Sequence, residues 1–269
     1  MTDSLLPGPL WLAGCGNMAG AMLARWLEQG VDPAHVSVIR PSGRPVDGDV
    51  RVTTDWPEDE VPAIVLLGMK PYQLDVVAET LAPILDGETI LVSILAGVEL
   101  VSLRARFPTP RNIIRAMPNL PVRIGKGVTG LHGKSDLEAR TLVTGLMAVL
   151  GHAEWFEDER AFNLVTALSG SGPAFTYRFI DALAKAGATL GLPEPQALAF
   201  ARAAVEGAAA IAKTGGLSLA ERAREVTSPN GTTEAGLRVL DAELDDLIAR
   251  TLEAARRRSL EIAAEARSD

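Results

Sequence analysis

The sequence has 269 residues, of which 47% are hydrophobic and 22% are charged. At roughly 150 residues per domain, this length predicts about two domains, and the composition excludes a chain that is mainly disordered. The net charge of -8 has the wrong sign for a protein that gains affinity by neutralising phosphate backbones. We therefore expect no nucleic-acid partner.

Cysteine usage and the N-terminal segment suggest where the protein works. The single cysteine, Cys15, cannot form an intrachain disulfide, and no Cys/His cluster has the spacing of metal ligands. Residues 1–8 carry no cationic leader, and the longest apolar runs are too short to cross a bilayer. The sequence thus predicts a cytoplasmic protein that binds neither a metal nor a membrane.

Residues 10–116 alternate short apolar runs with helical stretches, the pattern of strand–helix–strand units on a parallel sheet. We predict strands at 10–13, 36–39, 50–53, 63–67, 89–94 and 112–116, and helices at 18–29, 71–81 and 98–106. A strand at 127–132, a helix at 135–150 and a strand at 153–156 complete this layer. The fold class is α/β, with a doubly wound Rossmann-type domain at residues 1–158.

After residue 158 the strand-like runs end, and long stretches rich in alanine and leucine follow. Helices are predicted at 159–168, 173–190, 195–213, 219–226, 233–240 and 242–264. Residues 159–269 therefore form an all-helical second domain.

The first predicted strand ends in a glycine motif of the form G-x-G-x-x-A, directly before a helix. In this context the first glycine allows a tight turn, the second lets a pyrophosphate approach the backbone, and the small third residue lets the helix pack closely. The N–H groups at the start of the helix then bind phosphates. The alternative is a glycine-rich structural turn. The predicted dinucleotide-binding residues are Gly14, Cys15, Gly16, Asn17, Met18 and Ala19.

The second strand ends at Arg40, where a domain specific for NAD would usually place an acid for the ribose hydroxyls. A guanidinium there favours a 2'-phosphate, and the Ser42 hydroxyl is a further donor. We predict a preference for NADPH, with NADH possible. The alternative is that Arg40 points only into solvent.

Other strand ends lie on the same cofactor side, because ligands of open α/β sheets bind beyond the carboxyl ends of the strands. The alternatives are a solvated lysine for Lys70 and purely structural turns elsewhere. The residues assigned to the cofactor on this argument are Gly68, Met69, Lys70, Pro71, Ile94, Leu95, Ala96 and Asn119.

Two small-residue segments of the helical domain each precede a helix and offer N–H donors and hydroxyls that suit a carboxylate. The first contains Ser169, Gly170, Ser171 and Gly172, and the second runs over residues 227–233. Ordinary capped helix starts are the alternative for each. Two such segments beside a nucleotide domain indicate a small anionic substrate.

At these segments the sequence resembles the pyrroline-5-carboxylate reductase family, which makes proline by reducing a cyclic imine. The departures from the family pattern are Met69 for valine, Tyr72 for glutamine, Leu120 for threonine and Asn230 for glycine; asparagine still tolerates a left-handed conformation. The resemblance spans nearly the whole chain, and its runs are Gly16-Asn17-Met18-Ala19, Lys70-Pro71, Met117-Pro118-Asn119, residues 168–174 and residues 228–233.

The resemblance implies that Thr233 hydrogen-bonds the imine nitrogen, and that Asn230, Gly231 and Thr232 hold the carboxylate together with the segment at 169–172. Glu159 and Glu225 flank these segments and are assigned to a polar substrate group, with a solvated surface carboxylate as the alternative. It also implies a homodimer or higher homo-oligomer.

Two alternatives remain at this point. A β-hydroxyacid dehydrogenase needs a basic lysine early in the long helix, where this chain has Arg178 and its next lysine only at Lys185. A non-enzymatic NADP-binding regulator would have no use for two substrate-type segments.

Overall fold

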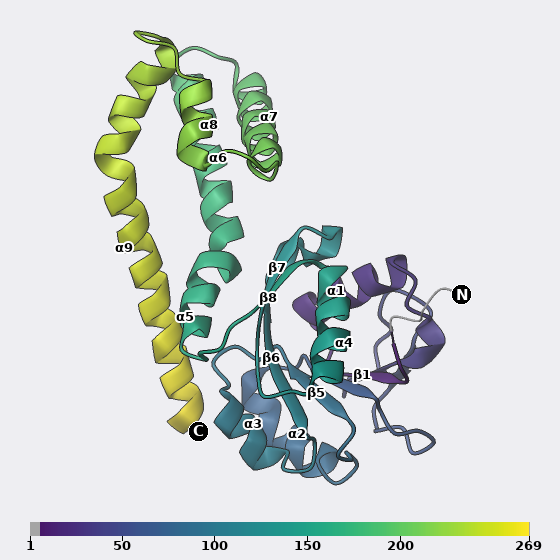
Figure 1. Cartoon of the computed structure of the whole chain (residues 1–269). Coiled ribbons are helices and arrows are strands. Elements are labelled where there is room, and N and C mark those ends of the chain that lie inside the picture. The colour runs from purple at the N-terminus through teal and green to yellow at the C-terminus, as the bar shows by residue number, and fades with distance from the viewer. Residues whose placement is uncertain (1–5, 269) are drawn as a thin grey trace. The chain divides into compact units, whose positions relative to one another are not determined.

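The computed structural model describes residues 6–268, in which strands and helices alternate up to residue 155 and helices follow (Figure 1). Its contacts divide it into two compact units: unit 1 comprises Met1–Ser171 and Ala255–Asp269, and unit 2 comprises Gly172–Ala254. The sequence predicts no leader in residues 1–8, and residues 1–5 of this segment lie outside the described residues.

Unit 1 contains an eight-stranded sheet in the order β3-β2-β1-β4-β5-β6-β7-β8. Only the β6–β7 pair is antiparallel, and the other neighbouring strands are parallel. This sheet, with the helical segments that follow it, confirms the predicted fold class. The strands are Leu10–Ala13 (β1), Val36–Ile39 (β2), Arg51–Thr53 (β3), Ile64–Leu67 (β4), Ile90–Ser93 (β5), Asn112–Pro118 (β6), Gly127–His132 (β7) and Gly151–Trp155 (β8).

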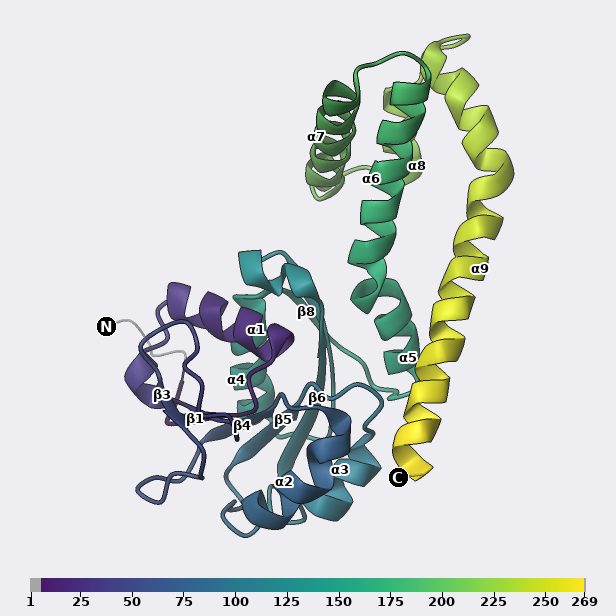
Figure 2. The ribbon, with the colours of Figure 1, turned by 180° about the vertical axis from the view of Figure 1, so that it is seen from behind.

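Helices cover both faces of this sheet, because the central strands β1 and β4 are apolar at every position. In β1, Leu10 and Leu12 belong to the core cluster shared with α1 and α4, whereas Trp11 and Ala13 belong to the cluster shared with α2 and α3. Figure 2 shows the two helix pairs on opposite sides of the strands. The helices are Asn17–Glu28 (α1), Leu74–Leu81 (α2), Leu100–Arg106 (α3) and Leu137–Ala148 (α4), and the 3-10 turns are Pro33–His35 (η1), Pro71–Gln73 (η2) and Leu120–Ile124 (η3).

Unit 2 consists of α6 (Gly172–Thr189), α7 (Glu194–Ala212), α8 (Leu219–Glu225) and the part of α9 (Thr232–Ser268) that ends at Ala254. The two helices predicted at 233–240 and 242–264 are one 37-residue helix, α9. The predicted break is wrong because the chain has no glycine or proline after Gly236, so nothing interrupts the hydrogen-bond ladder.

The segment at residues 159–174 also differs from the prediction of a helix followed by a loop. Helix α5 (Ala161–Val165) continues as a π-helical turn, η4 (Thr166–Gly170), in which the Ser171 amide donates to the Thr166 carbonyl at 3.0 Å. Ser169 and Gly170 are therefore helical, and Ser171 is the single non-helical residue between the π-turn and α6. A π-turn inserts an extra residue into a helix and is frequent at functional sites.

The last turns of α9 belong to unit 1 and contact α5 and the turn after β5. The Ser259 hydroxyl donates to Asn163 Oδ1 at 2.9 Å, and Ala263 is buried. Gly97, in the turn between β5 and α3, has φ of 78° and approaches this end of α9, because a Cβ placed on it would lie 3.3 Å from Ile262.

Candidate active site

The candidate cofactor site lies at the carboxyl ends of the central strands. Ala13, Leu67 and Ser93 are aligned across β1, β4 and β5, so the residues that follow them form one row at the sheet edge. β6 extends beyond this row, since Arg115 pairs with Ser93 and the strand continues to Pro118. The edge therefore brings together the turns at Gly14, Gly68 and Ile94, and Asn119 lies further along the strand direction, after the end of β6.

The turns after β1 and β4 approach each other to a distance that only glycine permits. Gly14 has φ of 81°, and a Cβ there would lie 2.9 Å from the backbone of Met69. A Cβ on Gly68 would lie 2.8 Å from the Cβ of Ala19. The small residue at position 19 thus lets α1 approach the end of β4. The motif alone predicted only that α1 packs closely on its own strand, β1.

Gly16 differs from these two glycines, because its missing side chain leaves open space. A Cβ built there would meet no atom within 4 Å, and Gly16 directly precedes the first residue of α1, Asn17. Cys15, between the glycines, is half-buried, and burial raises the pKa of its thiol more than the nearby Arg40 guanidinium lowers it. The turn thus presents open backbone at a helix start and a protonated thiol at neutral pH.

Arg40 and Ser42 follow β2 beside this turn. The Arg40 amide donates to the Thr53 carbonyl at 3.0 Å, and among residues 6–268 its guanidinium forms no ion pair. Ser42 is exposed, and its hydroxyl accepts only a long bond of 3.4 Å from the Arg44 amide. A guanidinium and a hydroxyl are therefore both available to a ligand.

The predicted residues after β4 and β5 differ in how far they reach the surface. Lys70 is exposed at the start of η2, and its amide donates to Gln73 Oε1 at 3.0 Å. Ile94 is half-buried and Ala96 is exposed, while Leu95 is buried in the core. Leu95 consequently offers a ligand its backbone more readily than its side chain.

Asn119 is buried, and its side-chain amide is bonded to backbone on both sides. Its Oδ1 accepts from the Val128 amide at 2.8 Å, and its Nδ2 donates to the Ser169 carbonyl at 2.9 Å. The predicted cofactor residue thus links the start of β7 to the π-turn. In that turn, the Ser169 hydroxyl donates its hydrogen to the Val165 carbonyl at 2.8 Å, so this hydrogen is already in a hydrogen bond.

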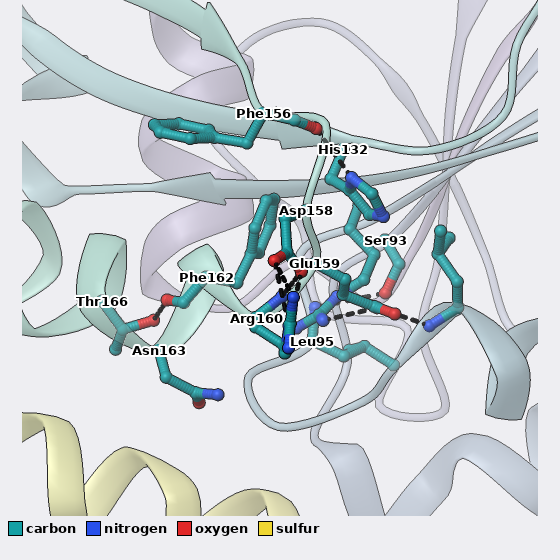
Figure 3. A network of polar contacts seen from close by, with 12 residues as sticks. Ser93, Leu95, His132, Phe156, Asp158, Glu159, Arg160, Phe162, Asn163 and Thr166 are labelled. Atoms are coloured by element: carbon teal, nitrogen blue, oxygen red, sulfur yellow. Dashed lines mark hydrogen bonds and ion pairs between the residues drawn. The ribbon is translucent and has the colours of Figure 1, made fainter.

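Glu159 forms an ion pair with the buried Arg115 and is itself 27% exposed, so it is not a freely solvated surface carboxylate. Its Oε1 accepts from Arg115 Nη1 and from the Leu100 amide, each at 2.7 Å, and the Arg115 side chain is 6% exposed. The Arg115 guanidinium also lies over the Phe162 ring, 4.7 Å from its centroid. Figure 3 shows this network, in which Glu159 joins β6 to the first turn of α3.

This network contains the site-adjacent residues that the sequence prediction missed. In the predicted strand 112–116, Arg115 stands between the apolar residues Ile114 and Ala116, and a charge on a doubly covered strand needs a buried partner. That signal would have indicated a carboxylate partner for Arg115 without identifying which one.

The second predicted substrate segment lies in unit 2 and forms a tight turn before α9. Asn230 has φ of 58°, the left-handed conformation that asparagine tolerates, and its amide donates to Glu234 Oε2 at 2.8 Å. Gly231 is required by the turn, because a Cβ there would lie 2.3 Å from the Ser228 hydroxyl. Its amide donates to the Ser228 carbonyl at 3.0 Å.

The threonines after this turn leave their hydroxyls available. Thr232 and Thr233 are exposed in the first turn of α9, and neither hydroxyl has a hydrogen-bond partner among the described residues. Thr251, later in the same helix, donates instead to the Leu247 carbonyl at 2.8 Å. Glu225 ends α8, is exposed, and lies 3.9 Å from Arg222.

Comparison with known proteins identifies the family. Residues 159–262 match the family model described as pyrroline-5-carboxylate reductase dimerisation. The pyrroline-5-carboxylate reductase of Pseudomonas aeruginosa is 35% identical over 259 residues, covering 93% of this chain and 95% of that protein. The chain belongs to the pyrroline-5-carboxylate reductase family. A second relative of that name, from Pisum sativum, is 34% identical over 86% of this chain and 87% of its own.

Solved structures of this family share the fold. The Coxiella burnetii pyrroline-5-carboxylate reductase superposes with a TM-score of 0.87 at 30% identity, covering 96% of this chain and 99% of that one. The Plasmodium falciparum pyrroline carboxylate reductase, solved with NADP bound, superposes with a TM-score of 0.83 at 22% identity and covers 96% and 98% of the two chains. At that identity the second likeness concerns the fold alone.

Membership in the reductase family confirms the predicted activity, reduction of the cyclic imine 1-pyrroline-5-carboxylate to proline. It does not favour a β-hydroxyacid dehydrogenase or a non-enzymatic regulator. The match to the dimerisation model supports a homo-oligomer. Within residues 6–268, no helix is long and apolar enough to span a bilayer.

Proposed function

We propose that the turn from Gly14 to Ala19 and the neighbouring strand ends at 68–71 and 94–96 hold NADPH. The open space at Gly16 and the free first turn of α1 fit a pyrophosphate, which needs close approach to backbone N–H groups. When bound, the reduced nicotinamide supplies the hydride. The residues of this site then fix the position of the nicotinamide ring relative to the imine carbon.

Arg40 and Ser42 give the preference for NADPH over NADH in this proposal. The observation that supports it is the unpaired guanidinium beside the glycine turn, since a cation there attracts a 2'-phosphate. Arg40→Ala is expected to lower kcat/KM for NADPH about tenfold or more while leaving that for NADH unchanged. Arg111→Ala is the control, because Arg111 is an exposed arginine at the amino end of β6 that pairs with Glu88. An equal change with both cofactors would remove Arg40 from this role.

The substrate carboxylate is held, in this proposal, by N–H groups and hydroxyls of residues 169–172 and 230–232. The amides of Asn230 and Gly231 are bonded within the turn, and this turn leads into the first turn of α9, which begins at Thr232, a setting that favours an anion. Glu225 is close to this turn in sequence and stays a predicted contact for a polar substrate group. Glu159 serves the substrate only through the network that it holds.

Thr233 is the proposed hydrogen-bond partner of the imine nitrogen. A protonated imine carbon is already electrophilic, so hydride addition needs alignment and one polar contact at nitrogen instead of a strong general acid. The free hydroxyl of Thr233 meets that need. As hydride forms the new C–H bond, the C=N electron pair moves to nitrogen, which keeps its proton and becomes the amine of proline.

The test of this assignment is Thr233→Ala, assayed as imine-dependent loss of NADPH absorbance. We expect kcat to fall about tenfold or more, with recovery in Thr233→Ser, which keeps the hydroxyl. Thr251→Ala is the control, since its hydroxyl is bonded within α9. Full turnover of Thr233→Ala would contradict the role, and failure of the wild-type protein to consume NADPH with the imine would contradict the reaction itself.

We further propose that the assembly is a dimer whose helical domains interlock, so that each site is completed by a second copy. Mixing and refolding Thr233→Ala with the cofactor-defective Gly16→Asp tests this. A site built from one chain's cofactor turn and its partner's Thr233 regains activity in the mixed dimer, whereas a site within one chain does not. The proposed domain limits, 1–158 and 159–269, and the cytoplasmic location stay predictions.

A further inference from the structure

Asn119 carries an inference that goes beyond the cofactor contact predicted for it. It directly follows the end of β6, it is 6% exposed, and both ends of its side-chain amide are bonded to backbone groups. One bond fixes the start of β7 through Val128, and the other fixes the carbonyl of Ser169 in the π-turn. Each bond uses one of the two Nδ2 hydrogens or one of the two Oδ1 lone pairs, and both hold the side chain to backbone groups.

The Ser169 carbonyl needs such a donor because of the sequence that follows it. In an α-helix this carbonyl would accept from the amide four residues later, but that residue is Pro173, which has no N–H. A carbonyl shielded from water without a partner is costly, and in this part-buried position Asn119 Nδ2 supplies a donor. The bond therefore belongs to the turn that presents Ser169, Gly170 and Ser171.

We propose that Asn119 is a positioning residue for substrate, acting through the π-turn at residues 166–170 and not through the cofactor. The proposal rests on the proposed function, in which residues 169–172 hold the substrate carboxylate. Without the Nδ2–H donor the turn loses its link to the end of β6, and its N–H groups and hydroxyls no longer keep one geometry. Affinity for the imine then falls while the cofactor site, built on the turns after β1, β4 and β5, is unchanged.

The matched control is Asn112, a buried asparagine at the opposite end of the same strand. Its side chain also makes two hydrogen bonds, donating to Asp136 Oδ2 at 2.8 Å and accepting from the Asp136 amide at 3.0 Å. Asn112→Ala therefore removes a similar pair of bonds from β6 without touching the π-turn. Asn119→Asp keeps the acceptor for Val128 and replaces the donor to Ser169 with a carboxylate oxygen, which repels that carbonyl.

The kinetic test compares KM for the imine and Kd for NADPH across these variants. Asn119→Ala and Asn119→Asp are expected to raise imine KM about tenfold, as the loss of one buried hydrogen bond at the site predicts, with NADPH affinity within twofold of wild type. Asn112→Ala should change neither. Weakened NADPH binding, or an imine KM no higher than in Asn112→Ala, would overturn the proposal.

Hydrogen exchange at the amides of residues 166–172 gives a readout that needs no substrate. Both Asn119 variants should exchange faster there than wild type, and Asn112→Ala should not. Unchanged exchange in Asn119→Ala would overturn the positioning role even if activity fell. Because this measurement is independent of turnover, it separates failure of this inference from failure of the proposed reaction.

Discussion

The two units of the chain bury their apolar side chains to very different extents. In unit 1, large residues such as Trp11, Leu66 and Phe107 are completely enclosed between the sheet and its helices. In unit 2, the buried hydrophobic residues among those described are Ala184, Ala197 and Ala201. Large apolar residues of unit 2 stay exposed, among them Tyr177, Phe200, Ile211, Val226, Val239 and Leu247.

This difference shows that only unit 1 has a core of its own. Helices with apolar side chains on their surface lose the favourable burial that offsets conformational entropy. Large exposed apolar patches on a globular protein mark an interaction surface. The dimerisation model matches this part of the chain, so a second copy is the expected cover.

The largest effect should come from placing a charge on that exposed surface. Val239 in α9 and Val101 in α3 are 66% and 69% exposed, so they are matched in type and exposure but belong to different units. Burial of a valine contributes about 1.5–3 kcal/mol, and a dimer buries two copies. We expect Val239→Asp to weaken self-association about 100-fold or more and to abolish activity at low concentration, while Val101→Asp does neither.

Analytical ultracentrifugation over a dilution series measures this association. A second readout comes from the tryptophans, since Trp11, Trp26, Trp56 and Trp155 all lie in unit 1. Val239→Asp should lower helical circular dichroism while leaving their fluorescence native. If the two variants kept the same oligomeric state, unit 2 would not be the association surface and the comparison of the units would fail.

The sequence predicts features that depend on neighbouring residues. The bounds of β1, β2 and β7 agree with prediction because each apolar run is closed by residues that favour turns. Gly14 and Asn230 both adopt the positive φ that their turns require. In these places the conformation follows from neighbouring residues, because each turn or apolar run includes the residues that determine it.

Features that depend on distant partners could not be predicted in the same way. Glu159 bonds to Arg115 across 44 residues and Asn119 to Ser169 across 50, and nothing in either local pattern identifies the other end. The π-turn could not be predicted either, because small residues at 169–172 are compatible with a loop as well as with a helix. The sequence therefore finds the elements and the motif residues, whereas the contacts that fix them come from the fold.

An effect of intermediate size tests how firmly unit 1 holds its own network. Glu159→Ala would leave the buried Arg115 guanidinium and the Leu100 amide without their acceptor. Removing one partner of a buried pair costs about 3 kcal/mol, so the urea midpoint followed by tryptophan fluorescence should fall clearly. The control is Asp59→Ala, because its pair with Arg51 is largely exposed and should have no measurable effect. A midpoint equal to that of Asp59→Ala would mean that the network contributes nothing to unit 1.

The smallest effect concerns acid stability and a carboxylate at the amino edge of the sheet. Asp86 Oδ1 accepts from the amides of Thr89 and Glu88, each at 2.9 Å, and from the Thr89 hydroxyl at 3.1 Å. The hydrogen bond donated by the Thr89 backbone amide is the main cause that holds the pKa of Asp86 below its ordinary value. A carboxyl group with a lower pKa in the folded state stabilises the fold above its unfolded pKa of about 4, and this contribution is lost as pH falls through the folded pKa.

Asp86→Asn should therefore reduce stability at pH 7 and progressively less below about pH 4, where the wild-type carboxyl becomes protonated and is also neutral. The measurement is the urea midpoint by tryptophan fluorescence from pH 7 to pH 3. Asp245→Asn is the control, because Asp245 is an exposed residue of α9 in unit 2. A gap between wild type and Asp86→Asn that stayed constant with pH would show that the amide contacts act through shape and not through charge. A gap that closes in acid would instead place part of the pH dependence of unit 1 at the turn before β5, outside the network around Glu159.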